Sequence, residues 1–224
     1  MNYHIVSLFP QALDSYINES ILKRAQEDNL IKIKFYNPRD YTEGNSYSDR
    51  RVDDRPYGGG PGMVIEALPV IKAIEDIYKD IKDKKKAKIV WFTPSGKQFD
   101  TKLAKNYSKK YTDIIFICGR YEGIDARVKK VFKAEEISIG PFVLTGGELP
   151  ALILIDTISR QIKGVLGDSI SLEENRNASP DVYTRPEILE YNGKKLKVPK
   201  VLLSGNHKLI DEWREKNDKN SKND

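Results

Sequence analysis

The sequence predicts an α/β fold built around a mainly parallel sheet. Five short apolar segments have the composition of strands, at residues 3–8, 31–36, 88–93, 113–118 and 134–139. Segments with helical spacing separate most of them, and strands that alternate with helices need crossover connections, which produce parallel pairing. Glycine-rich turns follow the last two strands directly. Because open α/β sheets bind ligands beyond the carboxyl ends of their strands, these turns predict a ligand site.

Three groups of apolar residues fall on helical faces, because their members recur at intervals of three or four residues. The groups are Leu13, Ile17, Ile21, Leu22 and Ala25; then Val70, Ile71, Ile74 and Ile77; then Ala151, Leu152, Ile155 and Ile158. A face of this kind normally packs against the sheet. We therefore expect these residues in the core.

Two segments interrupt the alternation. Residues 37–62 are polar and rich in Asp and Arg, and they end in a glycine run; a loop of this length inside a compact domain is usually functional. Residues 164–183 have the composition of a linker. We predict a domain at residues 1–165, a linker at 166–178 and a small domain at 179–224, whose last residues from 216 are compositionally disordered.

Charge and composition restrict the function classes. The chain has 38 Lys and Arg against 33 Asp and Glu, and its pI near 9.0 favours a polyanionic partner only slightly. One cysteine with two distant histidines, His4 and His207, makes no standard zinc site. Any Mg²⁺ would be held by oxygen ligands without a dedicated protein cage. No apolar run approaches a membrane span and the amino terminus does not resemble a signal peptide, so we expect a cytoplasmic protein.

Common nucleotide and hydrolase motifs are absent from the sequence. The dinucleotide fingerprint fails from Gly58 because Met63 occupies its last glycine position, and Gly96-Lys97 is followed by Gln98 where a phosphate-binding P-loop needs Ser or Thr. Neither histidine lies in a recognisable nucleophile arrangement. These failures argue against kinases, GTPases, Rossmann dehydrogenases and triad hydrolases.

Nine motifs occur in one order along the whole chain. They are Ser7-Leu-Phe-Pro10, Asp54-Arg-Pro-Tyr-Gly-Gly-Gly-Pro-Gly-Met63, Thr93-Pro94, Cys118-Gly-Arg-Tyr-Glu-Gly-Ile-Asp125, Ser138-Ile-Gly140, Leu144-Thr-Gly-Gly-Glu-Leu-Pro150, Gly164-Val-Leu-Gly167, Tyr183-Thr-Arg-Pro186 and Leu203-Ser-Gly-Asn-His207. In these motifs the chain resembles the bacterial tRNA (guanine-N1)-methyltransferases, the TrmD family of the SPOUT class. The resemblance implies a deep trefoil knot, a homodimer, a small, mostly helical C-terminal domain that binds tRNA, and S-adenosyl-L-methionine bound in the knot.

By the same resemblance, three loops surround S-adenosylmethionine. Their residues are Thr93, Pro94, Gly119, Tyr121, Glu122, Ile139, Gly140, Pro141, Phe142, Val143, Leu144, Gly146, Gly147 and Pro150. Apolar side chains beside glycines suit an adenine that needs backbone partners in an apolar slot. Without the resemblance, these segments would be tight turns only. We expect the Glu122 carboxylate to attract the cofactor's positive groups; the alternative is an acid that stabilises a turn.

Methylation of guanine N1 needs a base for the N1 proton and a donor for the charge that develops on O6. Arg160 matches the family's arginine for the second role, and the alternative is an exposed helix arginine. Tyr57, Gly58 and Gly59 are expected at the substrate entrance, where Tyr57 can stack on a base or simply be a surface residue. Because N1 lies on the pairing edge, the target must be unpaired. The guanosine 3′ of the tRNA anticodon fits.

The chain departs from the family in its linker. Where the family has Glu-Glu-Asp-Ser-Phe, with Asp as the proposed base, this chain has Glu173-Glu-Asn-Arg-Asn177. An amide at Asn175 cannot accept the proton, so our hypothesis is that Glu174 supplies the base, with Glu173 or Asp168 as alternatives. Two other interpretations also remain open: the chain is a slow enzyme, or it is an impaired relic that only binds RNA and cofactor. A related SPOUT enzyme with another substrate is a third function.

The carboxyl end is shorter than is typical of the family, which weakens the expected grip on tRNA phosphates. Five lysines of the small domain either compensate or form a solvated face: Lys194, Lys195, Lys197, Lys200 and Lys208.

Overall fold

The computed structural model describes residues 1–43, 50–167 and 181–220, with side chains to residue 216. The chain divides into two compact units, Met1–Leu166 and Gly167–Asp224. Most of the predicted linker falls in residues 168–180, outside the described residues. In the described part of the chain, no helix is long and apolar enough to cross a bilayer.

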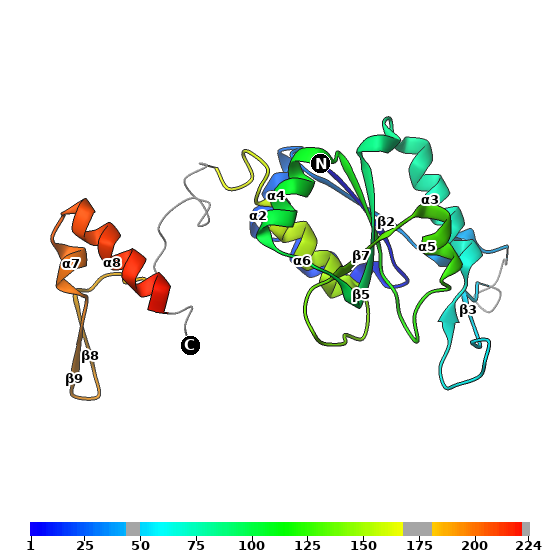
Figure 1. Cartoon of the computed structure of the whole chain (residues 1–224). Helices are drawn as coiled ribbons and strands as arrows, with labels where there is room; N and C mark the ends of the chain where they lie inside the picture. The colour runs from blue at the N-terminus through cyan, green and yellow to red at the C-terminus, as the bar shows by residue number, and fades with distance from the viewer. Residues whose placement is uncertain (44–49, 168–180, 221–224) are drawn as a thin grey trace. The chain divides into compact units, whose positions relative to one another are not determined.

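A five-stranded parallel sheet forms the centre of the first unit (Figure 1). Its strands are β1 (Asn2–Val6), β2 (Lys32–Tyr36), β5 (Ala87–Gln98), β6 (Asp113–Ile117) and β7 (Glu135–Ser138). Their order is β2-β1-β6-β5-β7 and every pairing is parallel. The structure thus confirms the five predicted strands and the parallel sheet.

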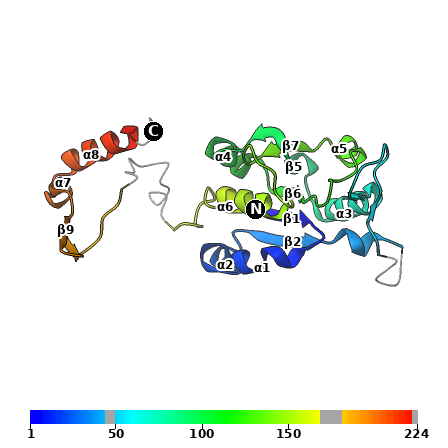
Figure 2. The same cartoon turned by 90° about the horizontal axis from the view of Figure 1, so that it is seen from below.

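Helices cover both faces of this sheet (Figure 2). The 3-10 helix η1 (Pro10–Leu13) and the helices α1 (Asp14–Ile17), α2 (Ser20–Glu27), α4 (Thr101–Lys110) and α6 (Glu148–Ser159) pack on one face. The helices α3 (Ala67–Asp80) and α5 (Arg127–Phe132) pack on the other. Phe116 faces the first core, and its neighbours Ile115 and Ile117 face the second, as the alternation of a strand requires.

The three predicted helical faces are mostly buried, as expected. Val70, Ile74 and Ile77 on α3 are fully buried, and so is Ile155 on α6. The first face is buried except at Ile21, although residues 10–27 form three short helices instead of one. Ser20 has a positive φ of 48°, which breaks the run and turns the Ile21 side chain outward to 36% exposure.

Part of the predicted long loop is ordered. The 3-10 helix η2 (Pro38–Tyr41) follows β2, and β3 (Asp53–Asp54) pairs antiparallel with β4 (Val64–Ile65). The glycine run therefore connects two short strands. A further 3-10 helix, η3 (Lys84–Lys86), leads into β5 within the lysine-rich segment.

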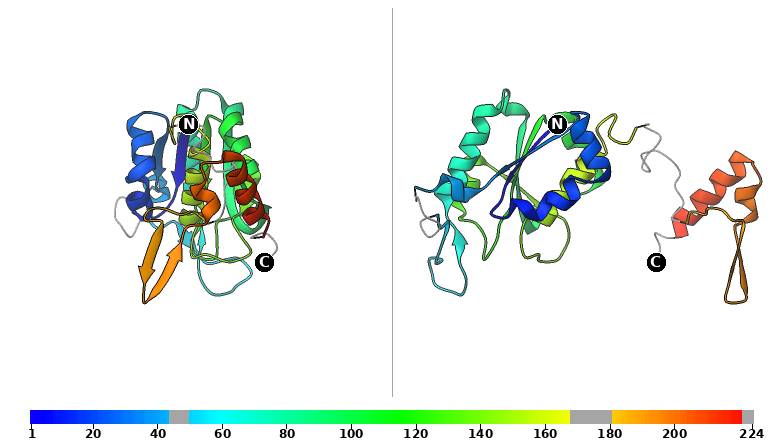
Figure 3. Two further views of the ribbon diagram at one scale, coloured as in Figure 1. Left: turned by 90° about the vertical axis from the view of Figure 1, so that its left-hand side faces the viewer. Right: turned by 180° about the vertical axis from the view of Figure 1, so that it is seen from behind.

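The second unit contains a hairpin that the predicted helical domain did not include (Figure 3). The strands β8 (Ile188–Tyr191) and β9 (Lys194–Lys197) pair antiparallel across Asn192 and Gly193, both of which have positive φ. Asn-Gly is the strongest short-range hairpin signal, so the sequence held this information. The helices α7 (Lys200–Leu203) and α8 (His207–Asn220) follow, and α8 extends into the segment predicted to be disordered.

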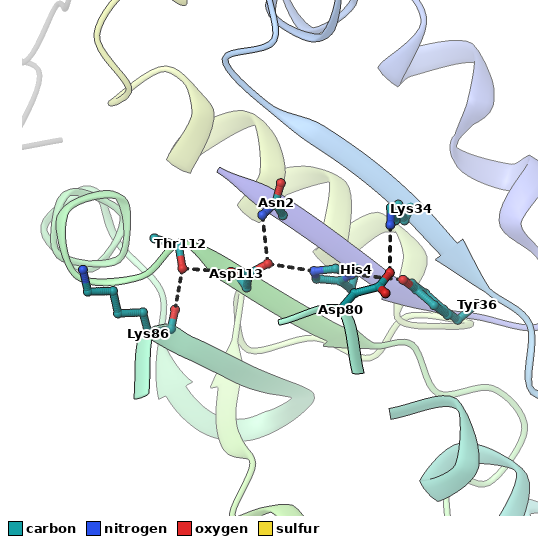
Figure 4. Close-up of polar contacts among 8 residues, drawn as sticks. All are labelled: Asn2, His4, Lys34, Tyr36, Asp80, Lys86, Thr112 and Asp113. Atoms are coloured by element: carbon teal, nitrogen blue, oxygen red, sulfur yellow. Dashed lines mark hydrogen bonds and ion pairs between the residues drawn. The ribbon is translucent and has the colours of Figure 1, made fainter. Parts of the chain in front are cut away.

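A buried polar network joins the amino ends of β1 and β6 (Figure 4). His4 Nε2 lies 3.0 Å from Asp113 Oδ1, and Asn2 Nδ2 and Thr112 Oγ1 donate to the same carboxylate. Burial lowers the pKa of His4 despite the hydrogen bond and charge of Asp113. Burial by itself raises the pKa of Asp113, but the hydrogen bonds from His4, Thr112 and Asn2 outweigh burial, and that pKa is lowered. The pair is therefore a neutral imidazole that donates to a carboxylate.

Candidate active site

A cavity lies where β5, β6 and β7 end. Its walls come from an irregular part of β5 around Thr93, from the turn after β6 at residues 119–123, and from residues 139–147 after β7. Every predicted cofactor residue except Pro141 lines it. The structure therefore brings three segments that are far apart in the sequence into one site.

Several lining residues were missed by the motif reading. They are Phe92, Arg120, Gly123, Ile137, Ser138 and Thr145. Each of them lies within two positions of a predicted residue in the chain. Their place at the strand ends would have indicated them. The last residues of parallel strands and the turns after them share one edge of the sheet.

Two walls of the cavity touch through bare backbone at Gly147. Its N–H donates to the Gly119 carbonyl over 3.0 Å, and a Cβ on Gly147 would lie only 2.6 Å from Cys118 Cα. Only glycine permits this approach. The turn after β7 consequently rests directly on the end of β6, where Cys118 is buried and burial raises the pKa of its thiol.

The rim of the cavity exposes apolar side chains. Tyr121 is 50% exposed, Phe142 is 51% exposed and Val143 is 84% exposed. Ser138 Oγ donates to the Gly140 carbonyl and accepts from the Gly140 N–H, which fixes the turn beside them. Exposed apolar residues around a concave site indicate that a ligand covers them.

The glycine-rich segment is attached to the turn after β6. Glu122 N donates to the Met63 carbonyl, and Ile65 N donates to the Gly123 carbonyl. A Cβ on Gly62 would lie 2.6 Å from Glu122 Oε1. These contacts place the Glu122 carboxylate between the cavity and the glycine-rich segment.

The predicted substrate residues lie apart from this cavity. Tyr57 is fully exposed and lines a second hollow, together with Leu68 and Arg127. Gly58 and Gly59 have positive φ, and a Cβ on either one would meet open space. In this second hollow a hydrogen bond from Arg127 lowers the pKa of Asp125.

Comparison with known proteins identifies the family. The family model described as tRNA (Guanine-1)-methyltransferase TrmD matches residues 1–223. The chain belongs to this family. A tRNA (guanine-N(1)-)-methyltransferase of Clostridioides difficile is 48% identical over 222 residues, covering 96% of this chain and 90% of the relative. Relatives of the same name from Carboxydothermus hydrogenoformans and Campylobacter jejuni subsp. doylei are 46% and 45% identical; the matches cover 96% and 94% of this chain, and 82% and 88% of the relatives.

The cavity fits the cofactor that the TrmD family implies, S-adenosylmethionine. Gly119, Gly146 and Gly147 line the cavity, and their lack of side chains lets the turns after β6 and β7 pack closely around it. Apolar groups from Ile139, Val143 and Leu144 stand beside them. The described part of the chain holds no cluster of three or more His, Cys, Asp or Glu side chains that could bind a metal.

Of the predicted catalytic residues, Arg160 lies in the described part of the chain, and it does not line the cavity. Arg160 caps the carboxyl end of α6, whereas Gly147 and Pro150 at its amino end line the cavity. Because α6 has 12 residues, these ends are about 18 Å apart. Glu174 and Asn175 lie outside the described residues. One subunit therefore does not bring Arg160 to its own cavity through this helix.

Proposed function

We propose that this chain methylates N1 of the guanosine 3′ of the tRNA anticodon, using S-adenosylmethionine. One observation carries the proposal: a chain of the TrmD family has its predicted cofactor residues gathered in one cavity at the ends of three parallel strands. When bound, S-adenosylmethionine supplies a methyl group made electrophilic by a positive sulfonium. The chain acts in the cytoplasm, where its substrate tRNA is found.

The cavity residues hold the cofactor in three ways. Backbone groups of the turns at residues 119–123 and 139–147 pair with the adenine and the polar end of the ligand. Val143 and Leu144 cover its apolar surface. The Glu122 carboxylate attracts its positive charges from the side of the glycine-rich segment. The close contact of Gly147 with Gly119 and Cys118 supports the further proposal that the chain forms a trefoil knot here.

The reaction also requires a base for the N1 proton and a hydrogen-bond donor to O6. A carboxylate removes the N1 proton, and Glu174 takes this role because Asn175 has no basic oxygen. Arg160 donates to O6 and stabilises the negative charge that develops there. The guanine must be unpaired while it reacts, and the exposed Tyr57 offers a ring on which an extruded base can stack.

The position of Arg160 supports a homodimer. The apolar side chains Leu149 and Ile153 of α6 and Tyr16 of α1 border a common hollow and are all largely exposed. A second copy that packs its own α6 antiparallel on this face, about a twofold axis, carries its Arg160 toward the amino end of the first α6. Each cavity then receives an arginine from the other subunit.

A methyl-transfer assay tests the proposed function. Purified protein is incubated with labelled S-adenosylmethionine and unmodified tRNA, and the nucleosides are analysed by mass spectrometry. We expect 1-methylguanosine, and we expect no transfer to tRNA that has adenosine at the target position. Cofactor binding without product would instead identify an impaired relic, an alternative that 45–48% identity to three named methyltransferases disfavours. Another methylated nucleoside would identify a different SPOUT substrate.

The identity of the base makes a separate prediction. Glu174→Gln should lower turnover by roughly two orders of magnitude or more, because general bases contribute about 10²–10⁴-fold. Its affinity for the cofactor should stay unchanged in calorimetry. Asn175→Asp restores the family's acid and should raise turnover. Glu173→Gln is the matched control, and wild-type turnover in Glu174→Gln would move the role to Glu173 or Asp168.

A further inference from the structure

A charged pair in the wall of the cavity, formed by the partly buried Arg120 and the buried Glu148, has no part in the chemistry described above. Glu148, the first residue of α6, is only 3% exposed. Its Oε2 lies 3.0 Å from Arg120 Nε, and its Oε1 accepts a hydrogen bond of 2.7 Å from Ser7 Oγ. A carboxylate in the first turn of a helix also interacts favourably with the helix dipole.

The pair connects three separate segments of the chain. Arg120 belongs to the turn after β6, and its Nη1 donates to the carbonyl of Thr145 in the turn after β7. Its guanidinium also lies 5.0 Å from the centre of the Phe9 ring. Ser7 fixes Glu148 to the residues that follow β1. Two of these three segments are walls of the cavity.

The glycines before Glu148 make room for the pair. A Cβ on Gly146 would lie 2.4 Å from Arg120 Nε and 2.6 Å from Glu148 Oε2. These two atoms are buried and close, but they are not aligned as a hydrogen bond. Charge attraction in a buried site therefore holds them together, so removing one charge leaves the other without compensation.

We propose that Arg120 and Glu148 are positioning residues that set the separation between the turn at 119–123 and the turn at 145–147. Neither is a catalytic residue, because Glu148 does not line the cavity and Arg120 is directed toward Glu148, Thr145 and Phe9. This inference rests on the proposed function, since it takes S-adenosylmethionine as the ligand of the cavity. It adds that the cavity depends on a charge pair of which only Arg120 lines it.

Glu148→Gln tests the inference, because it removes the charge and keeps the size of the side chain. The probe is S-adenosylhomocysteine, and calorimetry measures its Kd. We expect the Kd to rise by roughly fivefold or more, given the coupling usual for charged neighbours. The KM for tRNA should not change, and turnover should recover at saturating cofactor. Glu43→Gln, which breaks an exposed ion pair with Lys72, is the matched control and should bind as the wild type does.

A double variant separates positioning from direct contact. If Arg120 acts only through Glu148, then Arg120→Gln combined with Glu148→Gln should bind no more weakly than the weaker single variant. Additive losses would mean that Arg120 touches the ligand itself, which would overturn its assignment as a positioning residue. Should Glu148→Gln fail to fold, Arg120→Gln alone carries the test with the same expected loss.

Hydrogen exchange gives a readout without ligand. In Glu148→Gln, the amides of residues 119–123 and 145–147 should exchange faster, while those of β1 and β6 stay protected. A Kd that rises less than fivefold, or unchanged exchange in both turns, would overturn the inference. Wild-type protein that does not bind S-adenosylhomocysteine would overturn the proposed function instead, so the two failures are distinguishable.

Discussion

At the scale of single residues, the site depends on glycines, which have no side chain. Gly147 and Gly146 leave space that other atoms fill: the backbone of Cys118 and Gly119 in one case, and the Arg120–Glu148 pair in the other. Motif spacing located both glycines, yet it did not indicate what occupies the space. That information comes only from the packing of β6 against the turn after β7.

Gly147→Ala should destabilise the protein. Its Cβ would lie 2.6 Å from Cys118 Cα, and backbone cannot move aside as a flexible side chain can. We expect a loss of about 1–3 kcal/mol in the free energy of unfolding, seen as a lower Tm. Gly119→Ala is the control, because its Cβ would meet Ile124 at an ordinary 3.5 Å. Equal Tm values for the two variants would contradict this account.

At the scale of elements, the buried His4–Asp113 pair at the amino ends of β1 and β6 makes the stability of the protein depend on pH. His4 is buried between Asp113 and the Tyr36 hydroxyl, with Lys34 and Asp80 nearby. Because burial lowers its pKa, His4 stays neutral in the folded protein at a pH where the unfolded chain takes up a proton. Protonation therefore favours the unfolded state.

The free energy of unfolding should fall as the pH falls below about 6.5, the ordinary pKa of histidine. The contribution of Asp113, whose pKa is also lowered, should persist until the pH approaches about 4. Urea unfolding between pH 8 and pH 5 measures the first effect. His4→Gln should lose that part of the pH dependence. If the free energy of unfolding depends on pH equally in the wild type and in His4→Gln, groups other than His4 cause that dependence.

Helices and strands could be predicted from the sequence where a segment had a single clear pattern of apolar residues. The apolar spacing of α3 and the β-branched run of β6 left no competing interpretation. At residues 10–27 the prediction found the buried positions but missed the division into short helices, where Ser20 has a positive φ. It also missed the β8–β9 hairpin. The family resemblance implied a mostly helical domain, and the turn signal of Asn192-Gly193 was not used.

At the scale of the whole molecule, α6 has more apolar surface than one subunit can bury. One side of it packs in the core through Ala151, Ile155 and Ile158, yet Leu149 and Ile153 remain 58% and 45% exposed. A helix that is apolar all round is usually buried. The same helix separates Arg160 from the cavity. The second copy proposed on this face would account for both facts, and neither fact could be read from spacing along one chain.

Ile153→Glu should convert the dimer into monomers in sedimentation velocity, because it places a charge in the centre of the proposed interface. Methyl transfer should be lost with the dimer. Val131→Glu changes another exposed apolar residue, which lies on α5, and should leave the proposed dimer intact. A dimeric Ile153→Glu protein would place the interface elsewhere.

The strand order has a consequence for synthesis on the ribosome. β1 lies between β2 and β6, with Asn2 opposite Asp113. β1 therefore has only one of its two neighbours until translation has passed β6 at Asp113–Ile117. Pairing over such a separation is slow to form, and an unpaired edge invites wrong partners. The nascent chain must keep that edge shielded until β6 leaves the exit tunnel.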